Sequence, residues 1–158
     1  MSEKKLTHLD ADGQSHMVDV SDRDVTVRTA QASGHVSLSA EVITMLRDKT
    51  VPKGDVLATA RIAGIMGAKR TPDLIPLCHP IALHSVTVEC EVDGAGVAIV
   101  AKVKTADRTG VEMEALTAVS VAALTIIDMV KAVDPSAAIS HVQVDSKDGG
   151  RNGSWKRP

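Results

Sequence analysis

The apolar positions along the chain predict strands and helices that alternate. Residues 16–20 and 25–30 alternate polar with apolar side chains, which is typical of strands. Apolar residues then recur at helical spacing over about 39–49, behind a serine that suits the N-cap position. A second helix is expected to begin after Asp55 as its cap and to stop before Pro72, because proline cannot continue a helix.

The second half of the chain predicts a hairpin, a long helix and a last strand. Residues 85–92 and 97–103 alternate with period two and are joined by a glycine-rich turn. The longest predicted helix, 115–133, is apolar nearly all round, so we expect it to be buried or sandwiched between subunits. A strand over 139–147 completes the order. This order predicts an α+β fold on the βαββαβ plan with an added helix and an antiparallel sheet covered by helices on one face.

The core has to be built from small side chains. The 158 residues include 20 alanines and 21 valines, and Trp155 is the only aromatic residue. Since one aromatic ring buries roughly 150–250 Å², this chain gains little apolar area per residue, and we expect a homo-oligomer that buries further surface between subunits. The length predicts a single domain over 1–158, with flexible ends at 1–15 and 148–158.

Composition and charge argue against several classes of protein. Nucleic acid is not an expected partner, because base stacking needs exposed aromatic rings and residues 1–145 carry a net charge of −5. The longest apolar run that tolerates a serine, 118–127, is about half of the ~20 residues that cross a bilayer, so no membrane span is expected. The N-terminus lacks an apolar signal core, and Cys78 and Cys90 form no spaced pair, so we expect a cytoplasmic protein.

The loop 71–80 ends in a candidate group, Leu77-Cys78-His79. Three prolines in this loop argue against a central strand or a helix. His79 lies between a cysteine and Pro80, which restricts its backbone and aims its imidazole. The ring either stabilises the loop or contacts a ligand. No metal site is expected, because an adjacent cysteine and histidine lack the spacing of zinc ligands.

Charged residues at both ends of the long helix are further candidates. Glu112, Met113 and Glu114 either stabilise the helix dipole or, if the backbone is extended there, place paired acid and base groups over a flat ligand. Asp128 and Lys131, three residues apart, form either a structural ion pair or, because apolar residues precede Asp128, a partly desolvated catalytic pair.

Cations stand in uncrowded settings at Arg28, Lys53, Lys69-Arg70 and Lys147. Lys53 comes just before the N-terminus of a predicted helix, where backbone N–H groups favour an anionic oxygen such as that of a phosphate. Lys69 lies at the other end of that helix, where a cation usually stabilises the helix dipole.

The spacing along the long helix has a consequence for the site. Glu114 and Asp128 are 14 residues apart, which at ~1.5 Å per residue puts them on the order of 21 Å apart. They cannot share a small-molecule site within one chain. If both are functional, the site lies at a dimer interface, with Asp128 and Lys131 supplied by the second subunit.

Longer stretches resemble a known family. They are HMVDV at 16–20, KGDVLATARIAG at 53–64, DLIPLCHP at 73–80, GVEMEALTAVSVAALTIIDMVKAV at 110–133 and SKDGG at 146–150. In these motifs the chain resembles the molybdenum cofactor biosynthesis protein C family, the cyclic pyranopterin monophosphate synthases. The resemblance implies a ferredoxin-like subunit in a hexamer built as a trimer of dimers, with active sites at the dimer interfaces.

The resemblance also implies a reaction. A lyase of this family converts (8S)-3′,8-cyclo-7,8-dihydroguanosine 5′-triphosphate, the product of an upstream radical enzyme, into cyclic pyranopterin monophosphate with release of diphosphate, a step of molybdenum cofactor (molybdopterin) biosynthesis. An alternative from another class is a non-catalytic oligomeric module that binds a nucleotide or pterin. Acids that recur beside lysines in apolar surroundings argue against this alternative, because a binder needs the cations but not the acids.

The resemblance assigns roles residue by residue. The implied catalytic residues are Asp128, Lys131 and Lys53. The implied substrate-binding residues are Leu77, Cys78, His79, Glu112, Met113, Glu114, Arg28, Lys69 and Lys147. No cofactor is implied, and whether Mg²⁺ accompanies the substrate phosphates stays open.

Overall fold

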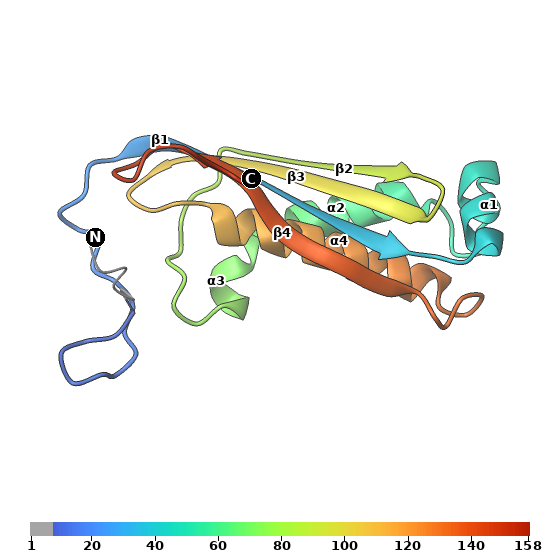
Figure 1. The fold of residues 1–158 in the computed structure, drawn as a ribbon, viewed down its shortest axis with the longest axis horizontal. Helices are drawn as coiled ribbons and strands as arrows, with labels where there is room; N and C mark the ends of the chain where they lie inside the picture. Colours follow the sequence, from blue (N-terminus) through green and yellow to red (C-terminus); the bar gives the residue numbers. More distant parts are fainter. Residues whose placement is uncertain (1–7) are drawn as a thin grey trace.

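A computed structural model describes residues 8–158 as one sheet with helices beside it (Figure 1). The strands are β1 (Thr26–Ser37), β2 (Ser85–Val92), β3 (Gly96–Asp107), β4 (Ala138–Asp148) and β5 (Trp155–Lys156). The helices are α1 (Ala40–Asp48), α2 (Val56–Lys69), α3 (Thr71–Leu74) and α4 (Glu112–Val130).

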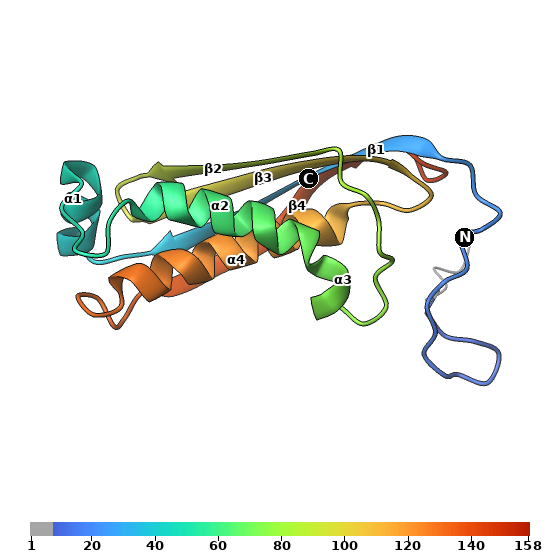
Figure 2. The same ribbon diagram turned by 180° about the vertical axis from the view of Figure 1, so that it is seen from behind.

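The strands of the described residues form a single antiparallel sheet in the order β2-β3-β1-β4-β5. Helices α2 and α4 run along one face of this sheet, whereas α1 lies at one end of it and α3 near the other (Figures 1 and 2). The order β2-β3-β1-β4, with two helices on one face, is the ferredoxin-like arrangement and confirms the predicted α+β fold class. Helix α1 is the added helix.

Aliphatic side chains between the sheet and the two long helices form the core. The largest fully buried apolar ones are Ile99, Ile126, Val36, Val42, Val97, Val103, Val111, Val119 and Val130. Helix α4 is long and apolar enough to cross a membrane by length and composition alone, but half of its most apolar stretch is buried inside the protein. Packing in the core therefore accounts for much of its apolar character.

Glycines allow α4 to approach both β1 and α2 closely. A Cβ atom at Gly34 in β1 would lie 2.6 Å from Cγ1 of Val119 in α4 and 2.9 Å from the carbonyl oxygen of His141 in β4. A Cβ atom at Gly67 in α2 would lie 2.7 Å from a methyl group of Val121 in α4. Backbone and side chains fill these spaces, so only glycine fits without a shift of its neighbours.

The predicted starts of the first two helices are confirmed. The side chain of Ser39 accepts a hydrogen bond from the N–H of Val42 at the start of α1, and the side chain of Asp55 accepts one from the N–H of Ala58 at the start of α2. These N-caps satisfy backbone donors that have no partner within the helix. Helix α2 ends before Pro72, as the sequence predicts.

Three segments differ from the prediction. Residues 16–20 are not a strand, because they lie outside the sheet and a side chain, His79, binds one of their carbonyl groups. The loop 71–80 opens with the short helix α3, where Pro72 occupies the first turn and its missing N–H breaks no helical hydrogen bond. The long helix begins at Glu112 rather than at residue 115.

Two strands reach beyond the segments that the pattern predicts. β1 continues to Ser37 as the central strand and pairs with β3 on one side and β4 on the other. β5 forms in the tail that we expected to be flexible, where Trp155 pairs with Lys147 of β4. The sheet therefore extends by one short strand next to the end of β4 that carries Lys147.

The close packing at Gly34 makes a prediction about stability. We expect Gly34→Ala to lower the free energy of unfolding by about 1–3 kcal/mol, because the new methyl group meets a buried valine and a backbone carbonyl. Gly94→Ala is the matched control, since a Cβ atom there has nothing within 4 Å. Urea unfolding at fixed protein concentration measures both changes. Equal stability of the two variants would contradict the packing described here.

Candidate active site

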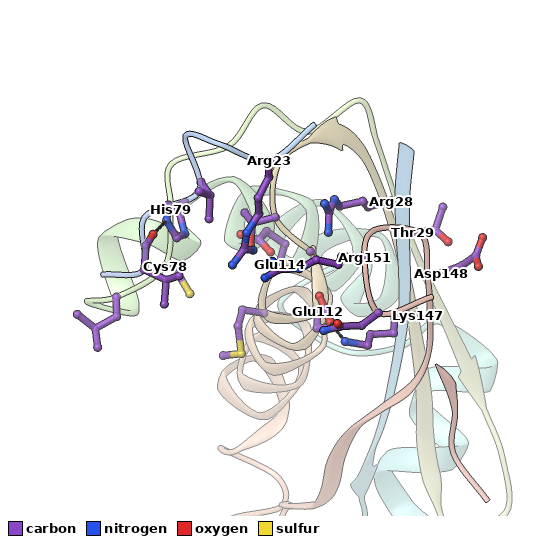
Figure 3. Close-up of a pocket in the computed structure, with 18 of the residues that line it drawn as sticks. Arg23, Arg28, Thr29, Cys78, His79, Glu112, Glu114, Lys147, Asp148 and Arg151 are labelled. Atoms are coloured by element: carbon purple, nitrogen blue, oxygen red, sulfur yellow. Dashed lines mark hydrogen bonds and ion pairs between the residues drawn. The ribbon is translucent and has the colours of Figure 1, made fainter. Parts of the chain in front are cut away.

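A cavity of about 540 Å³ opens at one end of the sheet (Figure 3). Its walls come from the ends of β1 and β4, the loop that carries residues 77–79, the start of α4 and the irregular segment 18–23. Eight of the residues predicted from the sequence line it, namely Arg28, Leu77, Cys78, His79, Glu112, Met113, Glu114 and Lys147. The fold thus brings together most of the predicted substrate-binding residues.

The two carboxylates at the start of α4 have different environments. Because the backbone is helical here, Glu112 and Glu114 do not lie on one side, which corrects the alternative of paired carboxylates on an extended segment. Oε1 of Glu112 lies 2.8 Å from Nζ of Lys147 in a partly buried ion pair. The side chain of Glu114 is buried, and burial raises its pKa to about 7, with the charge of Glu112 acting in the same direction. Glu114 is therefore suited to gain or lose a proton near neutral pH.

The loop beside these acids presents His79 and Cys78. Nε2 of His79 lies 2.6 Å from the carbonyl oxygen of Val18. Because a carbonyl only accepts, Nε2 donates, and the neutral ring keeps Nδ1 as an acceptor. His79 therefore fixes the loop to another wall and also lines the cavity. Burial raises the pKa of the Cys78 thiol, and Glu114 acts in the same direction, so the thiol stays protonated at neutral pH.

The remaining charge in the cavity comes mostly from cations. Besides Arg28 and Lys147, the structure places Arg23 and Arg151 in its lining. Figure 3 shows these side chains approaching the cavity from the segment 18–23, from β1, and from the end of β4 and the turn that follows it. Several guanidinium groups that face one cavity favour a ligand with more than one anionic group.

Arg23 and Arg151 are the functional candidates that the sequence did not reveal. Arg23 stands in a short polar segment without periodicity, so no pattern marks it. For Arg151 the sequence does contain an indication, because this residue follows the glycine pair Gly149-Gly150. A Cβ atom at Gly150 would collide with the guanidinium group of Arg28, so a glycine pair in this turn indicates a close approach to a functional side chain.

A second charged cluster lies at the other end of α4, and none of its members lines the cavity. Nζ of Lys53 donates to the carbonyl oxygen of Asp128 at 2.9 Å and lies 3.7 Å from its Oδ2, and Nζ of Lys131 lies 2.6 Å from its Oδ1. The pair Asp128 and Lys131 is thus confirmed as an ion pair. Within one chain Asp128 is exposed, and the hydrogen bond and charge of Lys131, together with the charge of Lys53, lower its pKa. The predicted desolvation of Asp128 is therefore absent in the single subunit.

Lys69 belongs to neither cluster. It is exposed at the C-terminal end of α2 and does not line the cavity. Over residues 8–158, no group of three or more histidine, cysteine, aspartate and glutamate side chains is arranged to hold a metal ion.

A ferredoxin-like subunit with a cation-lined cavity and a buried acid defines a small-molecule site for an anionic ligand. Comparison with protein families makes this assignment specific. The model of the MoaC family matches residues 17–150, so the chain belongs to the MoaC family.

Curated relatives extend this similarity over nearly the whole chain. The chain is 65% identical over 156 residues to a cyclic pyranopterin monophosphate synthase of Streptomyces griseus, which covers 99% of this chain and 88% of that protein. It is 59% identical over 160 residues to the protein of that name from a Nocardioides species, which covers 99% of this chain and 98% of the relative. Cyclic pyranopterin monophosphate synthase 2 of Mycobacterium tuberculosis is 56% identical over 153 residues, with 97% and 92% covered.

The raised pKa of Glu114 predicts how stability depends on pH. Between the usual pKa of a glutamate, near 4.5, and about 7, the folded chain holds a proton on Glu114 that the unfolded chain has lost. Stability is therefore expected to fall as pH rises through this window and to level off above it. We expect Glu114→Gln to remove this dependence and to be more stable than the wild type at pH 8 by up to about 3 kcal/mol.

Urea unfolding of both proteins from pH 5 to pH 8 measures this effect. The difference between the two proteins is the informative quantity, because all other titrating groups cancel in it. If the two stability curves stay parallel over this range, Glu114 is ionised throughout and the described environment is wrong.

Proposed function

We propose that this protein is a lyase that converts (8S)-3′,8-cyclo-7,8-dihydroguanosine 5′-triphosphate into cyclic pyranopterin monophosphate with release of diphosphate. Membership of the MoaC family and relatives named cyclic pyranopterin monophosphate synthase support this function. The single structural observation that supports it best is the cavity, in which cationic side chains that would bind a triphosphate lie beside a buried acid, Glu114, that would exchange protons with the ring.

The phosphate end of the reaction needs positive charge. An oxygen of the substrate forms a new bond to the α-phosphorus while the bond to the β-phosphate breaks, and negative charge collects on the departing diphosphate. Arg23, Arg28 and Arg151 line the cavity where they would meet such oxygens, and Lys147 is held beside them by Glu112. Guanidinium groups bind phosphate oxygens in pairs and stabilise this charge as it develops.

The ring end needs proton transfer without stacking. Opening and rebuilding a purine-derived ring moves protons at several heteroatoms, which calls for groups that titrate near neutral pH. Glu114 meets this requirement, and His79 offers Nδ1 to the ring edge. Because no phenylalanine, tyrosine or tryptophan within residues 8–158 lines the cavity, flat contacts would come from Leu77 and Met113.

The second cluster enters the proposal through a second copy of the chain. Asp128, Lys53 and Lys131 are exposed and lie at the far end of α4, on the order of 21 Å from Glu114. Apolar side chains on the same helical layer, Ile62 and Leu124, are also exposed. Two subunits packed through this layer would bury these side chains and bring Asp128 of one subunit to the cavity of the other. We propose that Asp128, Lys131 and Lys53 are the catalytic residues, in a trimer of dimers.

Some parts of the proposal concern the surroundings of the reaction. No resident cofactor is part of the proposal, and any Mg²⁺ would accompany the substrate phosphates. An upstream radical enzyme would supply the substrate, and both enzymes would work in the cytoplasm, in keeping with two free cysteines.

A contact of Lys69 with the substrate stays a prediction. A binding module without catalysis is not favoured, because the relatives are named as synthases.

The reaction tests this function directly. We expect the purified protein to release diphosphate from the cyclic dihydro-GTP derivative and to form the pyranopterin, both followed by chromatography with mass detection. Asp128→Asn should lower kcat by about 10²–10⁴-fold, as loss of an acid–base group does. Asp73→Asn is the matched control, because Asp73 is as exposed and also forms an ion pair with a cation three residues away. A normal rate in Asp128→Asn would remove Asp128 from catalysis.

A mixing experiment tests whether two subunits share each site. Glu114→Gln and Asp128→Asn subunits should each be nearly inactive alone. When they are produced together and pair at random, about a quarter of the shared sites contain neither substitution, so about a quarter of the wild-type activity should return. If the mixture is no more active than its two parents, each site is built within one chain and the shared site is wrong.

A further inference from the structure

The wall of the cavity that comes from the start of the chain is attached by very few hydrogen bonds. We call residues 8–24 the N-terminal arm. Within the described residues, its backbone forms turns with itself, such as the hydrogen bond from the N–H of Arg23 to the carbonyl oxygen of Val20. Only His79 and Arg108 connect the arm by hydrogen bonds to the rest of the described chain.

Arg108 makes two of these three connections. It follows β3, is half-buried, and does not line the cavity. Its Nη1 lies 2.6 Å from the carbonyl oxygen of Ser21 and 2.5 Å from that of Arg23. Arg108 has no carboxylate within ion-pair distance among the described residues, so its charge strengthens hydrogen bonds to neutral carbonyl groups.

The two carbonyl groups flank the part of the arm that reaches the site. The side chain of Arg23 extends from this part of the arm into the cavity (Figure 3). Asp107, the residue before Arg108, contacts a second arginine of the cavity. Its carbonyl oxygen accepts a hydrogen bond from Nε of Arg28 at 3.0 Å. The end of β3 and the residue after it therefore contact the guanidinium group of Arg28 and the backbone of Arg23.

We propose that Arg108 is a positioning residue that holds the N-terminal arm closed against the cavity and thereby places Arg23 on the substrate phosphates. The phosphate part of this inference rests on the proposed function. The holding of the arm depends only on the contacts of Arg108 and is measurable without substrate.

Hydrogen exchange of the full chain without substrate tests the holding of the arm. We expect Arg108→Met to speed exchange of the arm amides about tenfold or more and to leave the core strands unchanged, since local opening no longer breaks these bonds. The exchange rate of the arm in Arg108→Lys should lie between those of the wild type and Arg108→Met, because an ammonium group carries the charge but lacks the planar fork. Arg47→Met is the matched control, since Arg47 also donates to a backbone carbonyl, that of Asp93, away from the cavity.

Steady-state kinetics test how Arg108 acts. We expect Arg23→Met and Arg108→Met each to raise KM about tenfold, with a smaller change in kcat. The double variant should resemble Arg23→Met alone rather than show about a hundredfold rise, because Arg108 acts through Arg23. Arg108→Lys should raise KM less than Arg108→Met does, because it keeps the charge. A merely structural role would not predict this partial rescue.

The outcomes separate the two proposals. Unchanged exchange of the arm in Arg108→Met, or exchange that rises equally in Arg47→Met, overturns the positioning role. Multiplicative KM effects in the double variant overturn the action through Arg23. If the wild type does not turn over the substrate at all, the proposed function fails, and the exchange experiment still decides whether Arg108 holds the arm.

Discussion

The position of α4 against β1 and α2 is the constraint on which the rest of the structure depends. Small residues on the facing elements let this helix lie so close that a single methyl group at Gly34 would have no room. Because the helix is fixed along its length, both of its ends are fixed too. Its first turn carries Glu112 and Glu114 into the cavity, and its last turns carry Asp128 to the opposite end of the subunit. One packing interaction thereby sets the distance between the two halves of the proposed chemistry.

The same packing explains the electrostatics of the cavity. Helical backbone at residues 112–114 turns one carboxylate toward Lys147 and the next into the protein, where it loses water. The charge of Lys147 is then partly neutralised by Glu112. The guanidinium groups of Arg23, Arg28 and Arg151 stay directed into the cavity. In the proposed function, the guanidinium groups would bind the substrate phosphates, and the buried carboxyl group of Glu114 would exchange protons with the ring.

The sequence predicted those features that depend on local order. The caps at Ser39 and Asp55 and the hairpin of β2 with β3 follow from short-range rules, and they were correct. The prediction of a strand at residues 16–20 was wrong. Alternation of polar and apolar residues does not tell whether a segment pairs with another strand, and here the side chain of His79 binds the segment instead. Arg23 was missed for a related reason. Its place in the cavity is set by contacts with residues more than 80 positions away, which no local pattern records.

The lone tryptophan gives this molecule an unusual optical property. Trp155 lies on the two-residue strand β5, opposite Lys147 of the cavity and beside the guanidinium group of Arg157. All intrinsic fluorescence of the chain therefore comes from one edge of the sheet and none from its core. An emission signal would report the attachment of this edge, whereas circular dichroism would report the helices. Disagreement between the two signals during unfolding would mean that β5 detaches separately, rather than that the core unfolds in stages.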